Sequence, residues 1–354
     1  SVNIASGANA WFTWTYQSTA AGNLAVNTSA IGYSTYSKAT VTSAASDSNY
    51  INVEAPASLS SSIYTPAAKN IGQWLTVTMV VTNTGNANAV NVKPLTSLIL
   101  AGTGGAIRMN GPSPAAATIA GGTSQVYQWT YSAAGAGTVT FSGNASGADG
   151  NSGAAVSSPA SVSNVLTVQT GSSLSVVISA SPAVVGTGYP ITVTGVITNN
   201  GQATANNVRM NELDDVEVAV SGGNATLATG VVPSAGVVLA GGASASFTWT
   251  YTANTIGTIN FTGIATGVDN NTNLGVTSTA AVSNNVEIRN AAYLSSDINL
   301  LPAAVSVGQQ VTVLMNVTNT GLGAADFVTG ENIIQNGTAT LTYVSGPSPA
   351  TQSI

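Results

Sequence analysis

The chain has 354 residues, a net charge of −6 and only 5% charged residues, against roughly 25% in a typical soluble domain. Neither histidine nor cysteine occurs, which excludes Ser-His-Asp triads, Cys-His dyads and the usual zinc centres. The six basic residues are scattered and no apolar run reaches the length of a membrane span, so we expect no nucleic-acid partner and no spanning segment. This composition indicates a protein without enzymatic activity and is typical of surface layers, pili and stalks of prokaryotes.

The first predicted strand carries an aromatic motif that recurs along the chain. Phe12-Thr-Trp14-Thr-Tyr16 is repeated as 127–131 and 247–251, so Trp14, Trp129 and Trp249 lie 115 and 120 residues apart. The aromatic residues alternate with Thr or Gln, which places them on one face of a strand. We therefore expect the three tryptophans in domain cores; a platform for stacking sugars is the alternative.

A second predicted strand, residues 75–82, alternates apolar and mostly threonine positions and ends on the turn residues Asn83-Thr84-Gly85. The same strand and turn recur before Gly201 and Gly321, which gives spacings of 116 and 120 residues. A period of 115 to 120 residues fits one Ig-like domain of about 100 residues with its loops. The fold class predicted is all-β: tandem Ig-like β-sandwich domains, two complete and two half domains at the chain ends.

The repeat also predicts where the domains begin and end. Ile4, Ile119, Leu239 and Ile354 occupy one position of the repeat, so the first and last residues fall at the same point of a unit. Residues 57–171 and 172–290 read as complete sandwiches. Residues 1–56 read as the C-terminal half of a unit, and residues 291–354 as the N-terminal half.

Two hypotheses explain these half units. In one, residues 291–354 of one subunit pair with residues 1–56 of the next, which propagates a head-to-tail homopolymer through an obligate interface of more than about 2,000 Å². In the other, the chain is a part of a longer tandem array. The predicted subunit interface consists of Ile4, Trp11, Trp14, Val311, Val313, Met315 and Val317. Trp11 has the strand parity opposite to Trp14, so an isolated surface residue is its alternative interpretation.

The runs Val80–Val92 and Phe261–Asn271 resemble the Ig-like repeats of prokaryotic surface proteins, including CARDB-type cell-adhesion-related modules. Through its three copies the resemblance covers nearly the whole chain. It implies a β-sandwich and contributes no catalytic residues. Lys93-Pro94-Leu95 departs from the segment that usually follows in such modules. The resemblance implies stalks, surface-layer parts, adhesins or filament subunits without choosing among them.

Few carboxylates are available for a metal. Asp214 and Asp215 lie in an acidic cluster that occurs in one unit only, and Asp149 and Asp269 occupy equivalent Gly/Asn-rich turns, where the first unit has Ser34. Calcium binding by backbone carbonyls and these carboxylates is one hypothesis. The other is that the cluster is a solvated loop and that Asp149 and Asp269 are turn residues. No other cofactor is expected.

The sequence also offers possible glycosylation sites. Asn-x-Ser/Thr sequons occur at Asn27, Asn144, Asn224, Asn260, Asn270, Asn316 and Asn336. In a chain so rich in asparagine, serine and threonine their number is near chance, and they do not repeat at equivalent positions.

Together these patterns predict an extracellular or cell-surface structural subunit that polymerises head to tail. The alternative is an adhesin or surface-layer module that binds glycans or another cell, cropped from a longer array. Replacement of exposed Trp74 or Trp11 would distinguish the two, because only an adhesin would lose glycan binding.

Overall fold

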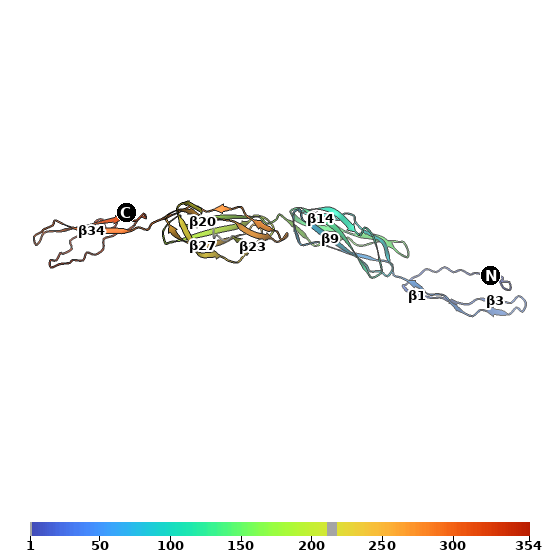
Figure 1. The fold of residues 1–354 in the computed structure, drawn as a ribbon. Helices are drawn as coiled ribbons and strands as arrows, with labels where there is room; N and C mark the ends of the chain where they lie inside the picture. Colours follow the sequence, from blue (N-terminus) through green and yellow to red (C-terminus); the bar gives the residue numbers. More distant parts are fainter. Residues whose placement is uncertain (1, 211–217) are drawn as a thin grey trace. The chain divides into compact units, whose positions relative to one another are not determined.

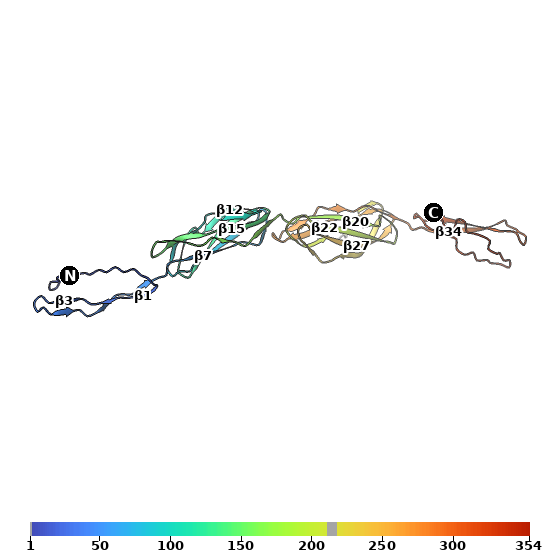
Figure 2. The ribbon, with the colours of Figure 1, turned by 180° about the vertical axis from the view of Figure 1, so that it is seen from behind.

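The computed structural model describes residues 2–210 and 218–354, and every regular element in these ranges is a β-strand. This confirms the predicted all-β fold. The chain forms two compact units, Ser1–Gln169 and Thr170–Ile354. Each unit contains one two-layered β-sandwich and one thinner terminal segment, seen as open ribbons around β1 and β3 and around β34 (Figure 1). The view from behind shows the same thinness at both termini (Figure 2).

Sandwich 1 is formed by the strands from β7 to β19. Their bounds are β7 (Leu59–Tyr64), β8 (Ala68–Asn70), β9 (Trp74–Asn83), β10 (Ala89–Pro94), β11 (Ile99–Gly102), β12 (Gly105–Ser113), β13 (Ala117–Ile119), β14 (Ser124–Gly135), β15 (Gly137–Gly143), β16 (Ala145–Asp149), β17 (Ala155–Ser157), β18 (Ser161–Val162) and β19 (Leu166–Gln169). One sheet has the order β12-β14-β9-β7, and the other two have the orders β13-β10-β16-β17 and β11-β15-β19-β8.

The core of sandwich 1 collects the apolar face of every sheet. Val77, Met79 and Trp129 come from the first sheet, and Val92 and Phe141 come from the other two. The period-two alternation of β9 and β14 produces this arrangement, because alternate side chains of a strand point to the same side. A single buried cluster, from Ala57 to Val168, joins the three sheets.

Sandwich 2 repeats this plan. Its strands are β20 (Leu174–Ser181), β21 (Val184–Gly186), β22 (Pro190–Asn199), β23 (Ala205–Met210), β24 (Val218–Ser221), β25 (Asn224–Val232), β26 (Val237–Leu239), β27 (Ser244–Thr255), β28 (Gly257–Asn260), β29 (Thr262–Gly263), β30 (Ala265–Asp269), β31 (Gly275–Thr277), β32 (Ala281–Val282) and β33 (Val286–Arg289). Its core cluster runs from Leu174 to Ile288 around Trp249.

The N-terminal segment, described over residues 2–56, has a set of short nested hairpins between residues 22 and 53. Its strands are β1 (Gly22–Leu24), β2 (Asn27–Thr28), β3 (Ile31–Tyr33), β4 (Thr40–Thr42), β5 (Ser46–Asp47) and β6 (Ile51–Val53). The pair Gly22 and Val53 repeats the pair Gly137 and Val168 of sandwich 1. The other two hairpins also keep the register of their equivalents in sandwich 1. The segment thus has the strand register of the second half of a sandwich.

The C-terminal segment, residues 291–354, has the register of the first half. Its strands β34 (Leu294–Leu301) and β35 (Thr312–Asn319) pair Leu294 with Asn319, as β20 and β22 pair Leu174 with Asn199. The amides and carbonyls of Ala325 and Ile354 exchange hydrogen bonds of 2.8 and 3.0 Å, at the position where Ala89 pairs with Ile119 in sandwich 1.

Candidate interaction surfaces at the chain ends

An asparagine, buried in both sandwiches and half-buried in the C-terminal segment, fixes the corner where each of the three long strands ends. The side-chain oxygen of Asn83 accepts hydrogen bonds from the amides of Ser58 and Gly85, both 3.1 Å long. Its amide group donates to the carbonyls of Ala87 and Ile119 over 2.8 and 3.0 Å. Asn199 and Asn319 make the equivalent four bonds. The C-terminal segment therefore has the complete corner of an intact sandwich.

The glycine two residues after each of these asparagines allows a close backbone approach. A Cβ on Gly85, Gly201 or Gly321 would lie 2.0 to 2.2 Å from a backbone carbonyl oxygen. That oxygen belongs to the residue three positions before the first strand of the unit: Pro56, Gly171 or Ala291. No side chain fits there, which explains the recurrent glycine. From the sequence these residues are predicted only as a turn; the recurrence of asparagine at one position of each unit is the signal for the corner.

The tryptophans occupy two different environments. Trp129 and Trp249 are 1% and 2% exposed, so the core encloses their rings and leaves no face for a sugar. The ring nitrogen of Trp129 donates to the carbonyl of Thr96 over 3.1 Å. Trp14, the third member of the motif, is 64% exposed, and its ring centroid lies 6.4 Å from that of Phe12.

The N-terminal segment exposes the whole aromatic motif. Residues 8–19 form no strand, and Trp11 is 89% exposed. Phe12, Tyr16 and Ile4 are also more than half exposed. In sandwich 1 the equivalent Tyr127 and Tyr131 are buried, and burial raises the pKa of both hydroxyls. These exposed apolar side chains lie close together in the sequence, unlike the isolated apolar residues of an ordinary protein surface.

The C-terminal segment also exposes apolar side chains, on β34, on β35 and on the residue before β35. Met315 is 41% exposed, Ile298 and Leu300 are more than half exposed, and Val311, Val313 and Val317 are half-buried. In the intact sandwiches the residues equivalent to Val311, Val313, Met315 and Val317 are buried. Within the described ranges β35 pairs with β34 alone, whereas β9 and β22 have a strand on each side.

Five strand pairings join the two halves of each intact sandwich. In sandwich 1 they are β14 with β9, β14 with β12, β16 with β10, β15 with β11, and β19 with β8. Sandwich 2 has the same five, β27 with β22 and with β25, β30 with β23, β28 with β24, and β33 with β21. In the described part of the terminal segments, every strand pairing belongs to one half alone.

The candidate calcium ligands Asp149 and Asp269 have hydrogen-bond donors on their carboxylates. Asp149 Oδ2 accepts from the amide of Ala57 (2.8 Å), and its Oδ1 accepts from the amides of Asn151 and Ser152 (3.0 and 2.7 Å) and from the Ser152 hydroxyl (2.9 Å). These bonds, the Ala57 amide first, lower the pKa of Asp149 from its ordinary value of 3.8 to about 2. Asp269 makes the equivalent bonds.

Nothing in this geometry favours a cation at these turns, because donors surround the carboxylate. Asp214 and Asp215, the other candidates, lie outside the described residues. Within residues 2–210 and 218–354 no three His, Cys, Asp or Glu side chains gather into a group that could hold a metal ion.

The sequons differ in accessibility. Four of the asparagines are exposed: Asn27, Asn270, Asn316 and Asn336. Asn144, Asn224 and Asn260 are half-buried, and the side-chain oxygen of Asn260 is buried without a hydrogen-bond partner. Asn316 stands out because it lies on β35, on the side of the strand opposite to Val313 and Met315.

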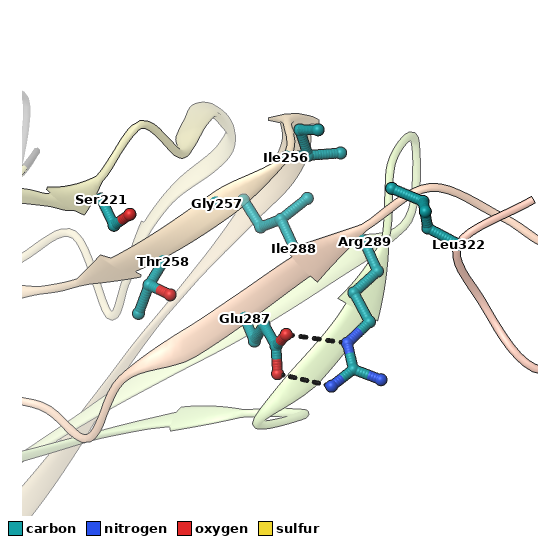
Figure 3. A pocket seen from close by; sticks show the side chains of 8 residues that line it. All are labelled: Ser221, Ile256, Gly257, Thr258, Glu287, Ile288, Arg289 and Leu322. Atoms are coloured by element: carbon teal, nitrogen blue, oxygen red, sulfur yellow. Dashed lines mark hydrogen bonds and ion pairs between the residues drawn. The ribbon is translucent and has the colours of Figure 1, made fainter.

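A surface depression at one end of sandwich 2 offers no catalytic chemistry. It is lined by Ser221, Ile256, Gly257, Thr258, Glu287, Ile288, Arg289 and Leu322 (Figure 3). Its carboxylate, Glu287, accepts two hydrogen bonds of 2.8 Å from the Arg289 guanidinium, which lowers the pKa of Glu287 and raises that of Arg289. The depression contains neither a nucleophile with an adjacent base nor a second acid.

Across the described residues no helix is long and apolar enough to pass through a membrane.

The chain is similar to known proteins only at the level of solved structures, and that similarity is low. No protein-family model matches the chain, and no curated protein is similar to it. Among solved structures it is similar to the C-terminal domain of the AgI/II polypeptide BspA of Streptococcus agalactiae, with 9% identity, a TM-score of 0.27, and 63% of this chain and 99% of that chain covered.

Two further solved structures show similar values. For the C-terminal domain of the antigen I/II-family protein AspA of Streptococcus pyogenes the identity is 10%, the TM-score 0.27 and the coverage 64% and 99%. For the adhesin InvE of Yersinia pseudotuberculosis they are 15%, 0.22, and 64% and 60%. TM-scores of this size carry no argument about function, and the Ig-like assignment rests on the sheets and cores described above.

Proposed function

We propose that this chain is a structural subunit of an extracellular filament or surface stalk. Residues 1–56 of one copy and residues 291–354 of a second copy form a third sandwich between them, with residues 57–171 and 172–290 as the two internal sandwiches. The contact joins different surfaces of the two copies, so it propagates head to tail. The role of the protein is mechanical, and the partner is another copy of itself.

The observation that supports this proposal is that each segment has the strand register of the half that the other lacks. The C-terminal segment has the pairings and the asparagine corner of a first half, and the N-terminal segment has the hairpins of a second half. The five pairings that neither segment makes are those that join the halves of an intact sandwich. Supplying them together would satisfy open strand edges and cover apolar side chains on both segments.

The intact sandwiches specify the register of this joint. Trp129 lies opposite Val77, and Trp249 lies opposite Val193. The residues at these two positions in the terminal segments are Trp14 and Val313. By the same equivalence Phe12 would lie opposite Met315. The segment with the aromatic motif, residues 12–16, would then form a strand between β35 and residues 340–348. On the outer surface of the sheet, Trp11 then lies opposite Asn316.

A cysteine cross-link tests this register directly, because the natural chain contains no cysteine. Directly opposed residues on one face have Cβ atoms about 4.5–5.5 Å apart, near the separation that a disulfide spans. We expect a Trp11→Cys chain mixed with an Asn316→Cys chain to give a covalent heterodimer on mild oxidation. Trp11→Cys mixed with Val317→Cys is the matched control, since residue 317 faces the core. Equal cross-linking of both mixtures, or of neither, would contradict the proposal.

A surface adhesin or surface-layer module within a longer tandem array is the second candidate. Trp74 favours it: this side chain is 68% exposed at the start of β9, beside the outward-facing Ile107 and Ser132. A ring of this kind can stack on a sugar. Loss of binding on a glycan array after Trp74→Ala would support this candidate, and a natural chain that binds no glycan on the array would count against it.

A further inference from the structure

The first residue of each intact sandwich is held by a carboxylate from the opposite half. The amide of Ala57 donates to Asp149 Oδ2 over 2.8 Å, and the amide of Ser172 donates to Asp269 Oδ2 over 2.7 Å. Each bond links residues 92 or 97 positions apart. Because one partner belongs to the first half and the other to the second, these bonds connect the same halves that the joint between copies would connect.

The N-terminal segment builds the same turn without the carboxylate. Asp149 pairs with Ala154 through its amide, and Ser34 pairs in the same way with Ala39. The Ser34 hydroxyl accepts from the amide of Ser37 over 3.3 Å, which reproduces the bond from Ser152 to Asp149 Oδ1. A serine has one neutral side-chain oxygen, so the second, charged oxygen that Asp149 offers to Ala57 has no counterpart at residue 34.

The C-terminal segment presents the matching donor. Ala292 stands at the position of Ala57 and Ser172, since the neighbouring Asn319 accepts from Tyr293 as Asn83 accepts from Ser58. The close approach of Gly321 to the Ala291 carbonyl repeats that of Gly85 to Pro56. In a completed joint the Ala292 amide of one copy therefore faces Ser34 of the other.

We infer that Ser34 makes the joint between copies weaker and more readily reversible than the sandwiches within each copy. This inference rests on the proposed function. A charged acceptor strengthens a hydrogen bond substantially, and both internal sandwiches have one where the joint has a neutral hydroxyl that also accepts from the amide of Ser37. Ser34 is thus a specificity-determining residue that distinguishes the contact made in trans from the two made within the chain.

The test is the Ser34→Asp variant of the full chain. We expect it to slow the dissociation of assembled protein after dilution, followed by light scattering, by roughly 10-fold to 100-fold. Thr35→Asp is the matched control, because it adds the same charge to the same turn at an exposed position; it should dissociate at the rate of the natural chain. In a reciprocal experiment, Asp149→Ser should lower the unfolding temperature of sandwich 1 and leave that of sandwich 2 unchanged.

The outcomes separate this inference from the function on which it rests. If neither the natural chain nor any variant assembles, the proposed function is wrong, and so is the proposed joint between copies. If the natural chain assembles and Ser34→Asp dissociates at the same rate, or if Thr35→Asp slows dissociation equally, only the role of Ser34 is overturned. An unchanged sandwich 1 in Asp149→Ser would also overturn it, because the carboxylate would then contribute nothing even where it is present.

Discussion

Asp149 shows how one side chain joins distant parts of a sandwich. Its pKa in the folded chain is about 2, below its ordinary value of 3.8. A depressed pKa means that the ionised form stabilises the fold, so this contribution is complete above about pH 4 and is lost as the pH falls toward 2.

For Asp149→Asn we expect a lower unfolding temperature for sandwich 1 at neutral pH and a smaller loss between pH 4 and pH 2. The amide group cannot accept the Ala57 bond with a second oxygen, and it does not titrate. Calorimetry measures both transitions in one chain, so sandwich 2 is the internal reference. A variant that keeps the full acid dependence of sandwich 1 would show that other carboxyl groups cause it.

Trp129 is the largest completely buried side chain of sandwich 1. Truncation in Trp129→Ala removes its core contacts and leaves a cavity, and we expect a loss of roughly 3–5 kcal/mol in the unfolding free energy. Denaturant unfolding should show this loss for sandwich 1, and Trp249→Ala should show it for sandwich 2. A loss below about 1 kcal/mol would mean that the core collapses around the smaller residue.

Among the elements, β35 has the clearest role in the proposed joint. In the proposed joint the side chain of Val313 points into the core, next to Trp14 of the other copy. The side chain of Thr312 points to the solvent side of the sheet. Val313→Asp would bury a charge opposite Trp14 of the next copy, and we expect it to abolish assembly. Thr312→Asp adds the same charge on the solvent side and should assemble normally. Sedimentation velocity distinguishes the two, and assembly of Val313→Asp would contradict the register.

Sequence patterns predicted those elements whose side chains alternate. The apolar positions of β9 and β22 and the aromatic motif of β14 and β27 repeat every second residue, which indicates one buried face, and the structure has these residues in its cores. The corner at Asn83 and the bond from Ala57 to Asp149 were not predicted, because each depends on residues that meet only after folding. Position in the repeat gives their equivalence but not their contacts. The domain boundaries and the interface residues stay predictions.

At the scale of the whole molecule, the proposal predicts a beaded thread. Negative-stain electron microscopy of the purified chain at micromolar concentration should show long threads in which each copy contributes two internal sandwiches and shares one at each end. Deletion of residues 291–354 removes the first half of the joint, so the threads should disappear. Short monomeric rods with frayed ends from the natural chain would support the tandem-array alternative.

The pair formed by Arg289 and Glu287 has a consequence for where such a thread can persist. It is the one salt bridge in the part of the chain that the structure describes, and both side chains are nearly half exposed. Dissolved ions weaken attractions between exposed charges, but they hardly affect apolar burial or backbone pairing at moderate concentration. An assembly held by apolar burial and backbone pairing should therefore keep its cohesion from low to moderate salt concentration.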